Sequence, residues 1–145
     1  MKQKKRNFSK QGKKNRAAGS RFELKVRKDL EAKGFIIDKW TNNVDLEEKR
    51  IVPAKRKYNP FFRALSVGTG FPDFLGIKME KTKKKELIGV EVKRNGYLSK
   101  DEKEKCRFYL KQKLFSKILI AKAIKEGRKL NIEYIDFEKK WKEKK

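Results

Sequence analysis

Two apolar segments, residues 72–78 and 86–93, lie on either side of a polar, lysine-rich turn. Their length, their β-branched content and the turn between them are typical of two strands paired as an antiparallel hairpin. In the second segment Ile88, Val90 and Val92 occupy every second position, and side chains along a strand point to opposite faces in turn. These three residues should face the core, which fixes the register of the hairpin.

Two further helices and three further strands are expected around this hairpin. Each helix contains a Ser-x-x-Glu capping box near its start, in which the side chains of the serine and the glutamate each accept a backbone N–H. The expected elements are a helix over about 20–33, a strand over 35–40, the hairpin, a helix from Ser99, and strands over 117–124 and 130–137. This order, αβββαββ, predicts an α/β fold.

The 145 residues fit one domain with a basic extension. Residues 1–17 carry many lysines and arginines and no acid, so they are predicted to form a disordered arm. Residues 18–137 form the predicted domain, with a long basic loop at about 41–70 that is irregular and contains two prolines. Residues 138–145 are a charged tail that we expect to be frayed.

The composition limits both the partners and the chemistry. A net charge of +24 favours a polyanion, and nucleic acid is the commonest such partner. Histidine is absent, which excludes Ser-His and Cys-His catalysis and histidine-ligated zinc. Cys106 is the only cysteine, so an internal disulfide is impossible and a reducing, cytoplasmic location is expected. No apolar run approaches the roughly 20 residues that cross a bilayer, so no membrane partner is expected.

A group of charged residues around the hairpin is the candidate for catalysis. Glu91 and Lys93 should point to the same side of their strand, and Asp73 on the preceding strand can lie beside Glu91. Two neighbouring carboxylates repel each other unless a divalent cation joins them, and the backbone carbonyl of Val92 can add an oxygen ligand. Mg²⁺ prefers such hard oxygen ligands and retains waters. Glu23, in the first helix, can reach the metal or its water from the side.

Each part of this pattern also has a plain structural explanation. A Glu-x-Lys on a strand is usually a solvated ion pair, and Pro-Asp is a common turn. Glu23 already has a role as the glutamate of a capping box. The combination is much rarer than its parts and favours a catalytic site, in which Lys93 orients the attacking water or stabilises charge on the phosphate.

Pro72-Asp73 together with Glu91-Val92-Lys93 resembles the PD-(D/E)xK signature of restriction-endonuclease-like nucleases. The surrounding sequence is similar to that of archaeal and archaeal-virus Holliday-junction resolvases. Residues 19–23 resemble the acidic N-terminal helix of those proteins, and residues 66–70 resemble their serine/glycine loop. The resemblance extends from residue 18 to about residue 137.

The resemblance implies a central mixed sheet flanked by helices, Mg²⁺-dependent phosphodiester hydrolysis with Mn²⁺ able to substitute, and a two-fold homodimer. It also implies that Glu23, Asp73 and Glu91 hold the metal, that Lys93 is catalytic, and that Ser66 touches the scissile strand.

Basic residues near these motifs are candidates for contacts with DNA phosphates. Besides Ser66, the candidate DNA-binding residues are Arg21, Arg94, Lys100, Lys55, Arg56 and Lys57. The aromatic residues that follow in the loop, Tyr58, Phe61 and Phe62, are expected to seal the core or a dimer seam rather than to stack on bases. No motif for sequence-specific base recognition is apparent.

The leading expectation is therefore a Mg²⁺-dependent, structure-selective DNA endonuclease with a four-way junction as its substrate. A nuclease with the same core that acts on flaps, replication intermediates or ordinary duplex is the alternative. A basic nucleic-acid-binding protein without catalysis is the alternative from another class, although it leaves Asp73 and Glu91 unexplained. The expected partners are branched DNA and a second copy of the chain, with no small-molecule cofactor.

Overall fold

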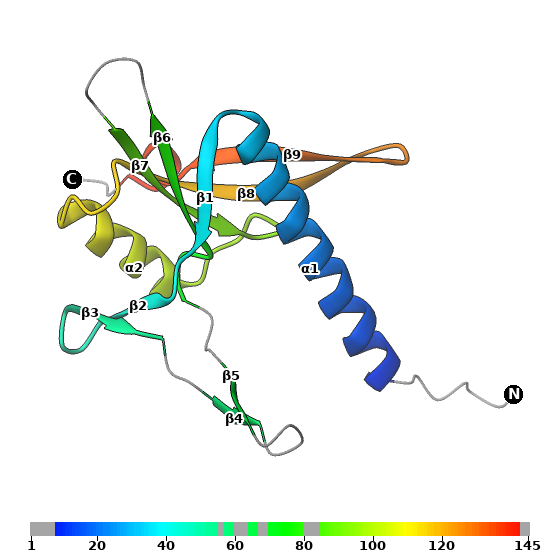
Figure 1. Cartoon of the computed structure of the whole chain (residues 1–145), viewed down its shortest axis with the longest axis horizontal. Helices are drawn as coiled ribbons and strands as arrows, with labels where there is room; N and C mark the ends of the chain where they lie inside the picture. Colours follow the sequence, from blue (N-terminus) through cyan, green and yellow to red (C-terminus); the bar gives the residue numbers. More distant parts are fainter. Residues whose placement is uncertain (1–7, 55–56, 60–63, 67–69, 80–84, 143–145) are drawn as a thin grey trace, which may run out of the picture.

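The computed structural model describes residues 8–54, 57–59, 64–66, 70–79 and 85–142. At its centre is a five-stranded sheet in the order β1-β6-β7-β8-β9 (Figure 1). Its strands are β1 (Phe35–Lys39), β6 (Phe74–Met79), β7 (Lys85–Val92), β8 (Lys117–Glu126) and β9 (Lys129–Asp136). β7 and β8 are parallel and the other neighbours are antiparallel, so the predicted α/β fold with a mixed sheet is confirmed.

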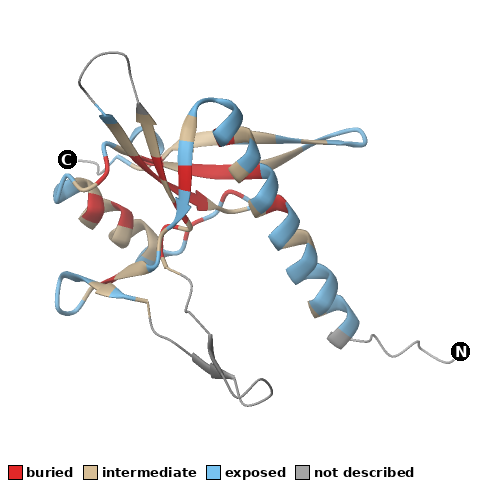
Figure 2. Cartoon of the chain, in the orientation of Figure 1, coloured by how far each residue is buried: buried red, intermediate tan, exposed pale blue. Residues whose placement is uncertain are grey.

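Two helices cover the two faces of this sheet. α1 (Phe8–Ala32) packs Phe22, Val26 and Leu30 against one face, where they form a core with Ile88 and Val90 of β7. Between β7 and β8, α2 (Lys100–Lys111) covers the other face. The core between α2 and the sheet contains Cys106, Tyr109, Phe115, Ile118 and Ile120, all of which are buried. Figure 2 shows buried segments on both α2 and the central strands.

Because both faces of β7 are covered, alternate residues along it lie in two different cores. Ile88 and Val90 belong to the α1 side, as the alternating pattern predicted, and Val92 packs against the same core. At Gly89, on the α2 side, an added Cβ would lie 2.9 Å from the Pro72 ring and 3.2 Å from Phe115. Glu91 points to the same side of β7 as Gly89, so it lies beneath α2 and the segment that precedes β6.

The predicted start of the first helix at Ser20 is wrong. α1 begins at Phe8, so Ser20 lies inside the helix and does not cap it. The predicted disorder of residues 1–17 is also wrong for residues 8–17, while residues 1–7 lie outside the described chain. Residues 8–17 include three lysines and Gln11, Arg16 and Ala17, which have good helix propensity and extend a helix that is nucleated by its packed C-terminal half.

The segment over 41–70 is not irregular throughout, as its composition suggested. It contains the antiparallel pair β2 (Asn42–Asp45) and β3 (Arg50–Pro53), and a second pair, β4 (Lys57–Asn59) and β5 (Ala64–Ser66). Asp45 forms the turn of the first pair, where its carboxylate accepts the backbone N–H groups of Glu47 and Glu48. The buried side chain of Val44 fixes this pair against the α2 core.

The C-terminal segment is partly ordered, in contrast to the predicted frayed tail. α3 (Phe137–Lys140) is a short helix whose N-cap is Asp136, and Phe137 is buried. Phe137 lies in the α2 core and Trp141 stacks on it, which holds this helical turn in place, whereas the sequence shows mainly charge. Within the described part of the chain, no helix is both long and apolar enough to cross a membrane.

Candidate active site

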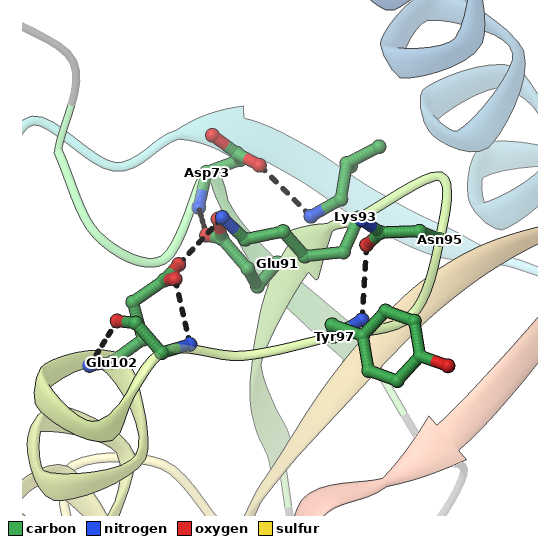
Figure 3. Close-up of polar contacts among 8 residues, drawn as sticks. Asp73, Glu91, Lys93, Asn95, Tyr97 and Glu102 are labelled. Carbon is green, nitrogen blue, oxygen red and sulfur yellow. Dashed lines mark hydrogen bonds and ion pairs between the residues drawn. The ribbon is translucent and has the colours of Figure 1, made fainter.

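The pairing of β6 with β7 brings Asp73 and Glu91 together. Phe74 pairs with Val90, so Asp73, just before β6, lies opposite Glu91. Each carboxylate accepts a backbone N–H from the strand segment that carries the other (Figure 3). The Asp73 N–H donates to Glu91 Oε2 at 3.0 Å, and the Val92 N–H donates to Asp73 Oδ2 at 2.8 Å. This exchange fixes both side chains, and the second oxygen of Glu91, Oε1, faces Lys93.

The electrostatics of the pair oppose its double negative charge. Glu91 is only 6% exposed, and burial together with the neighbouring charge of Asp73 raises its pKa well above the ordinary range. Burial also raises the pKa of Asp73 to about 6, and the charge of Glu23 contributes in the same direction against the hydrogen bond from Val92. Without a cation, the pair is therefore costly to keep ionised at neutral pH.

Lys93 lies between two acidic residues. Its Nζ is 2.7 Å from Glu102 Oε2 and 3.9 Å from Glu91 Oε1 (Figure 3). Burial alone would lower the pKa of Lys93, but the hydrogen bond to Glu102 and the charge of Glu91 outweigh it, and the pKa is raised. The ammonium group is therefore fully charged at neutral pH and is held beside the carboxylate pair.

Glu102 belongs to this site, although the sequence indicated only a capping role for it. The capping box at Ser99 is present as predicted. The Ser99 N–H donates to Glu102 Oε1, and the Glu102 N–H donates to Ser99 Oγ. Because one carboxylate oxygen caps α2 and the other binds Lys93, the helix start fixes the lysine. The sequence signal that could have identified Glu102 is the acidic start of α2, which follows Lys93 after a short connecting segment.

Val92 and Glu23 are the two remaining residues that were predicted to hold the metal. The N–H and C=O of one strand residue point to the same edge, so the Val92 carbonyl faces the edge where its N–H binds Asp73. Glu23 is half-buried on α1 and close enough for its charge to affect Asp73. Within the described ranges no three His, Cys, Asp or Glu residues converge as a metal-binding group, so the predicted three-carboxylate set is not assembled here.

The predicted DNA-binding residues are dispersed. Arg21 is exposed on α1, Arg94 is exposed on the segment that follows β7, and Lys100 is exposed at the first position of α2. The backbones of Lys57 and Ser66 pair in the β4–β5 ladder, but their side chains are outside the described structure. Lys55 and Arg56 also lie outside the described residues, as do Phe61 and Phe62.

A buried polar network holds the segment that presents Asp73. The Tyr109 hydroxyl donates to the Phe71 carbonyl at 2.6 Å and accepts the Trp40 Nε1–H at 3.1 Å. The Trp40 backbone N–H donates to the Asp73 carbonyl at 3.2 Å. A Cβ at Gly70 would clash with the carbonyl oxygens of Trp40 and Asn42, so only glycine allows this approach. No local sequence pattern indicated that Tyr109 would anchor this segment.

No protein-family model matches the chain, and comparisons with curated proteins and with solved structures also find no match. The chemistry of the site must therefore be inferred from its own geometry. That geometry comprises a buried carboxylate and a partly buried one linked by hydrogen bonds, a charged lysine beside them, and a third carboxylate that holds the lysine.

Proposed function

We propose that this protein is a Mg²⁺-dependent DNA endonuclease of the PD-(D/E)xK type, with Asp73, Glu91 and Lys93 at its active site. The observation that carries this proposal is the contact of Asp73 with Glu91: the Glu91 carboxylate accepts the Asp73 N–H and the Asp73 carboxylate accepts the Val92 N–H, in a setting that raises both pKa values. A buried like-charged pair costs stability unless something offsets it. Strongly perturbed acids in contact are more typical of functional sites than of structural ones.

The two carboxylates fit a hard divalent cation. Each has one oxygen on a main-chain amide, and the Val92 carbonyl points to the same edge of β7. Mg²⁺ commonly uses one or two carboxylates and keeps several waters, so a three-carboxylate cluster is not required. When bound, the cation would lower the pKa of a coordinated water and offset charge on the phosphate.

The chain's own residues would supply orientation and charge in the reaction. Hydrolysis joins the oxygen of water to phosphorus and breaks the bond to one bridging oxygen, which leaves with a proton. Lys93, held by Glu102, would place its ammonium group against the phosphate oxygens or the attacking water. Asp73 and Glu91 would bind the metal in their ionised forms.

DNA is the substrate class that the charge favours. The net charge of +24 suits a phosphate backbone. The resemblance of Pro72-Asp73 and Glu91-Val92-Lys93 to the resolvase motifs favours a branched substrate, with a four-way junction first. A homodimer belongs to the same proposal, since paired cuts need two sites at a fixed separation. Flap, replication-intermediate and duplex DNA are the alternative substrates.

The proposal is tested by cutting of labelled DNA with Mg²⁺ and with EDTA. We expect Mg²⁺-dependent cutting, and a loss of at least about 100-fold in Asp73→Asn and Glu91→Gln with binding retained, because loss of even an outer-shell partner costs roughly 10- to 100-fold. Glu86→Gln is the matched control, since Glu86 also lies half-buried on β7 but pairs with Lys117 at 2.9 Å.

Two results would contradict the proposal. Cutting that persists in Glu91→Gln, or that falls equally in Glu86→Gln, would mean that the site is elsewhere or absent. Wild-type binding without any cutting would favour the non-catalytic DNA-binding alternative. A panel of junction, flap, nicked and linear DNAs at one salt concentration decides the substrate.

A further inference from the structure

The outward surface of α1 carries a line of exposed basic side chains. They are Lys10, Lys14, Arg21, Lys25 and Lys28, and we call them the α1 stripe. At 100° per residue they fall within an arc of about 60°, and they extend over about 27 Å of helix. The N-terminal half of α1 extends beyond the sheet, and most of its surface is exposed (Figures 1 and 2).

The α1 stripe faces away from the candidate active site. On the same helical wheel, Glu23 lies about 170° from the middle of the stripe, and the buried face of Phe22, Val26 and Leu30 lies about 130° from it. Glu23 is the α1 residue whose charge acts on Asp73. A phosphate backbone that lies along the stripe is therefore separated from the Asp73–Glu91 pair by the thickness of the helix.

The line of cations is unfavourable for the helix itself. Arg21 and Lys25 are like charges four residues apart, and such pairs destabilise a helix, although the charge of Lys25 also acts on Asp29. The first turn of α1 contains no acidic residue to balance the positive end of the helix dipole. A polyanion along the stripe would offset both costs.

We propose that the α1 stripe binds the sugar–phosphate backbone of a DNA arm other than the arm that is cut. This inference rests on the proposed nuclease function and gives its substrate a second, separately held duplex segment. At 3.4 Å per base pair, 27 Å corresponds to about eight base pairs. An anionic membrane fits less well, because a helix that lies on a membrane needs a broad apolar face, and Leu24 is the main apolar residue on the outward side.

The first test measures binding of a four-way junction as a function of salt, without Mg²⁺. In the variant Lys14→Gln/Lys25→Gln/Lys28→Gln, three phosphate contacts are removed, and glutamine preserves helix propensity. Since each contact contributes about 0.9 to the slope of log K against log salt, the slope should fall by about 2.7. At 0.1 M salt this corresponds to a loss of affinity on the order of 10²- to 10³-fold.

The matched control removes the same charge from another exposed element. Lys125, Arg128 and Lys129 lie at the turn that joins β8 to β9, and all three are exposed. Their joint replacement by glutamine should change the slope by less than about 1. An equal loss in both variants would show that only net charge matters and would overturn the proposal. Loss of binding to phosphatidylserine vesicles but not to DNA would also overturn it.

The second test identifies which arm lies on the stripe. A photo-crosslinker on Lys25→Cys is specific, because the native Cys106 is fully buried. We expect crosslinks on an arm without the nick, whereas crosslinks beside the nick would refute the separate-arm geometry. If the wild type makes no nick, the nuclease proposal fails. In that case the positions of the crosslinks still test the stripe. Crosslinks confined to the DNA that lies against Asp73 and Glu91 would refute binding of a separate arm by the stripe, and crosslinks outside that DNA would support it.

Discussion

Replacing Asp73 by asparagine should stabilise the metal-free protein while abolishing its proposed activity. The pKa of Asp73 rises from an ordinary value of 3.8 to about 6 because of burial and the charge of Glu23. One pKa unit corresponds to about 1.4 kcal/mol, so the ionised form carries a penalty of up to about 3 kcal/mol. Asparagine is neutral, has almost the same shape, and keeps an oxygen that can accept the Val92 N–H.

The pH dependence of this effect has a definite sign. Between about pH 4 and 6 the folded protein binds more protons at Asp73 than the unfolded chain does, so stability falls as the pH rises. Urea unfolding at pH 7.5 should therefore give Asp73→Asn a gain of about 1–3 kcal/mol over the wild type. At pH 3.5, where the wild-type carboxyl is protonated in the folded state and mostly protonated in the unfolded chain, the gain should shrink toward zero.

Asp38→Asn is the control, because Asp38 lies on the neighbouring strand β1 but is exposed. Its stability should change by less than about 0.5 kcal/mol at either pH. Mg²⁺ at a hundred times its dissociation constant should stabilise the wild type by about 2.7 kcal/mol and Asp73→Asn by much less. An Asp73→Asn variant that is less stable than the wild type at pH 7.5 would refute the view that this carboxylate is electrostatically strained.

Three further changes have expected outcomes. Cutting activity should fall below about pH 6, since protons compete with the metal for Asp73, and a pH–rate profile that stays flat from pH 5 to 8 would contradict this. Glu102→Gln removes the charged partner that raises the pKa of Lys93, so the loss of activity on the basic side of the profile should move to lower pH. A purely structural role of Glu102 would change only the melting temperature. Tyr109→Phe leaves the buried Phe71 carbonyl without its donor and should lower the free energy of unfolding in urea by about 1–3 kcal/mol. An unchanged free energy of unfolding would show that Tyr109 does not anchor the segment that carries Asp73.

The hairpin was the most predictable part of the fold, because its register follows from local pattern. The β-branched residues at every second position of 86–93 determine which face of β7 packs on α1. Once that face is fixed, Glu91 must lie on the other, and the pairing of β6 with β7 brings Asp73 opposite it. The contact of the two acids follows from strand geometry that a sequence encodes directly.

Contacts between distant segments were not predictable in this way. Tyr109 reaches Phe71 only because α2 packs beside the segment that precedes β6, and no local pattern in α2 distinguishes that tyrosine from other core residues. The start of α1 was misplaced because a Ser-x-x-Glu pattern inside a longer helix has the same appearance as one at its start. The strands over 41–70 were missed because their pairing depends on an aspartate turn and on Val44, among many charged residues.

The complete burial of Cys106 provides a built-in reporter of opening. This thiol lies in the α2 core, and burial raises its pKa, so it is inaccessible and protonated in the folded protein. A thiol-specific reagent can modify it only when α2 separates from the sheet. The rate of labelling therefore measures how often the helix that carries Glu102 opens. A ligand that holds this helix against the sheet, such as a metal ion or DNA, would slow the labelling of the Cys106 thiol.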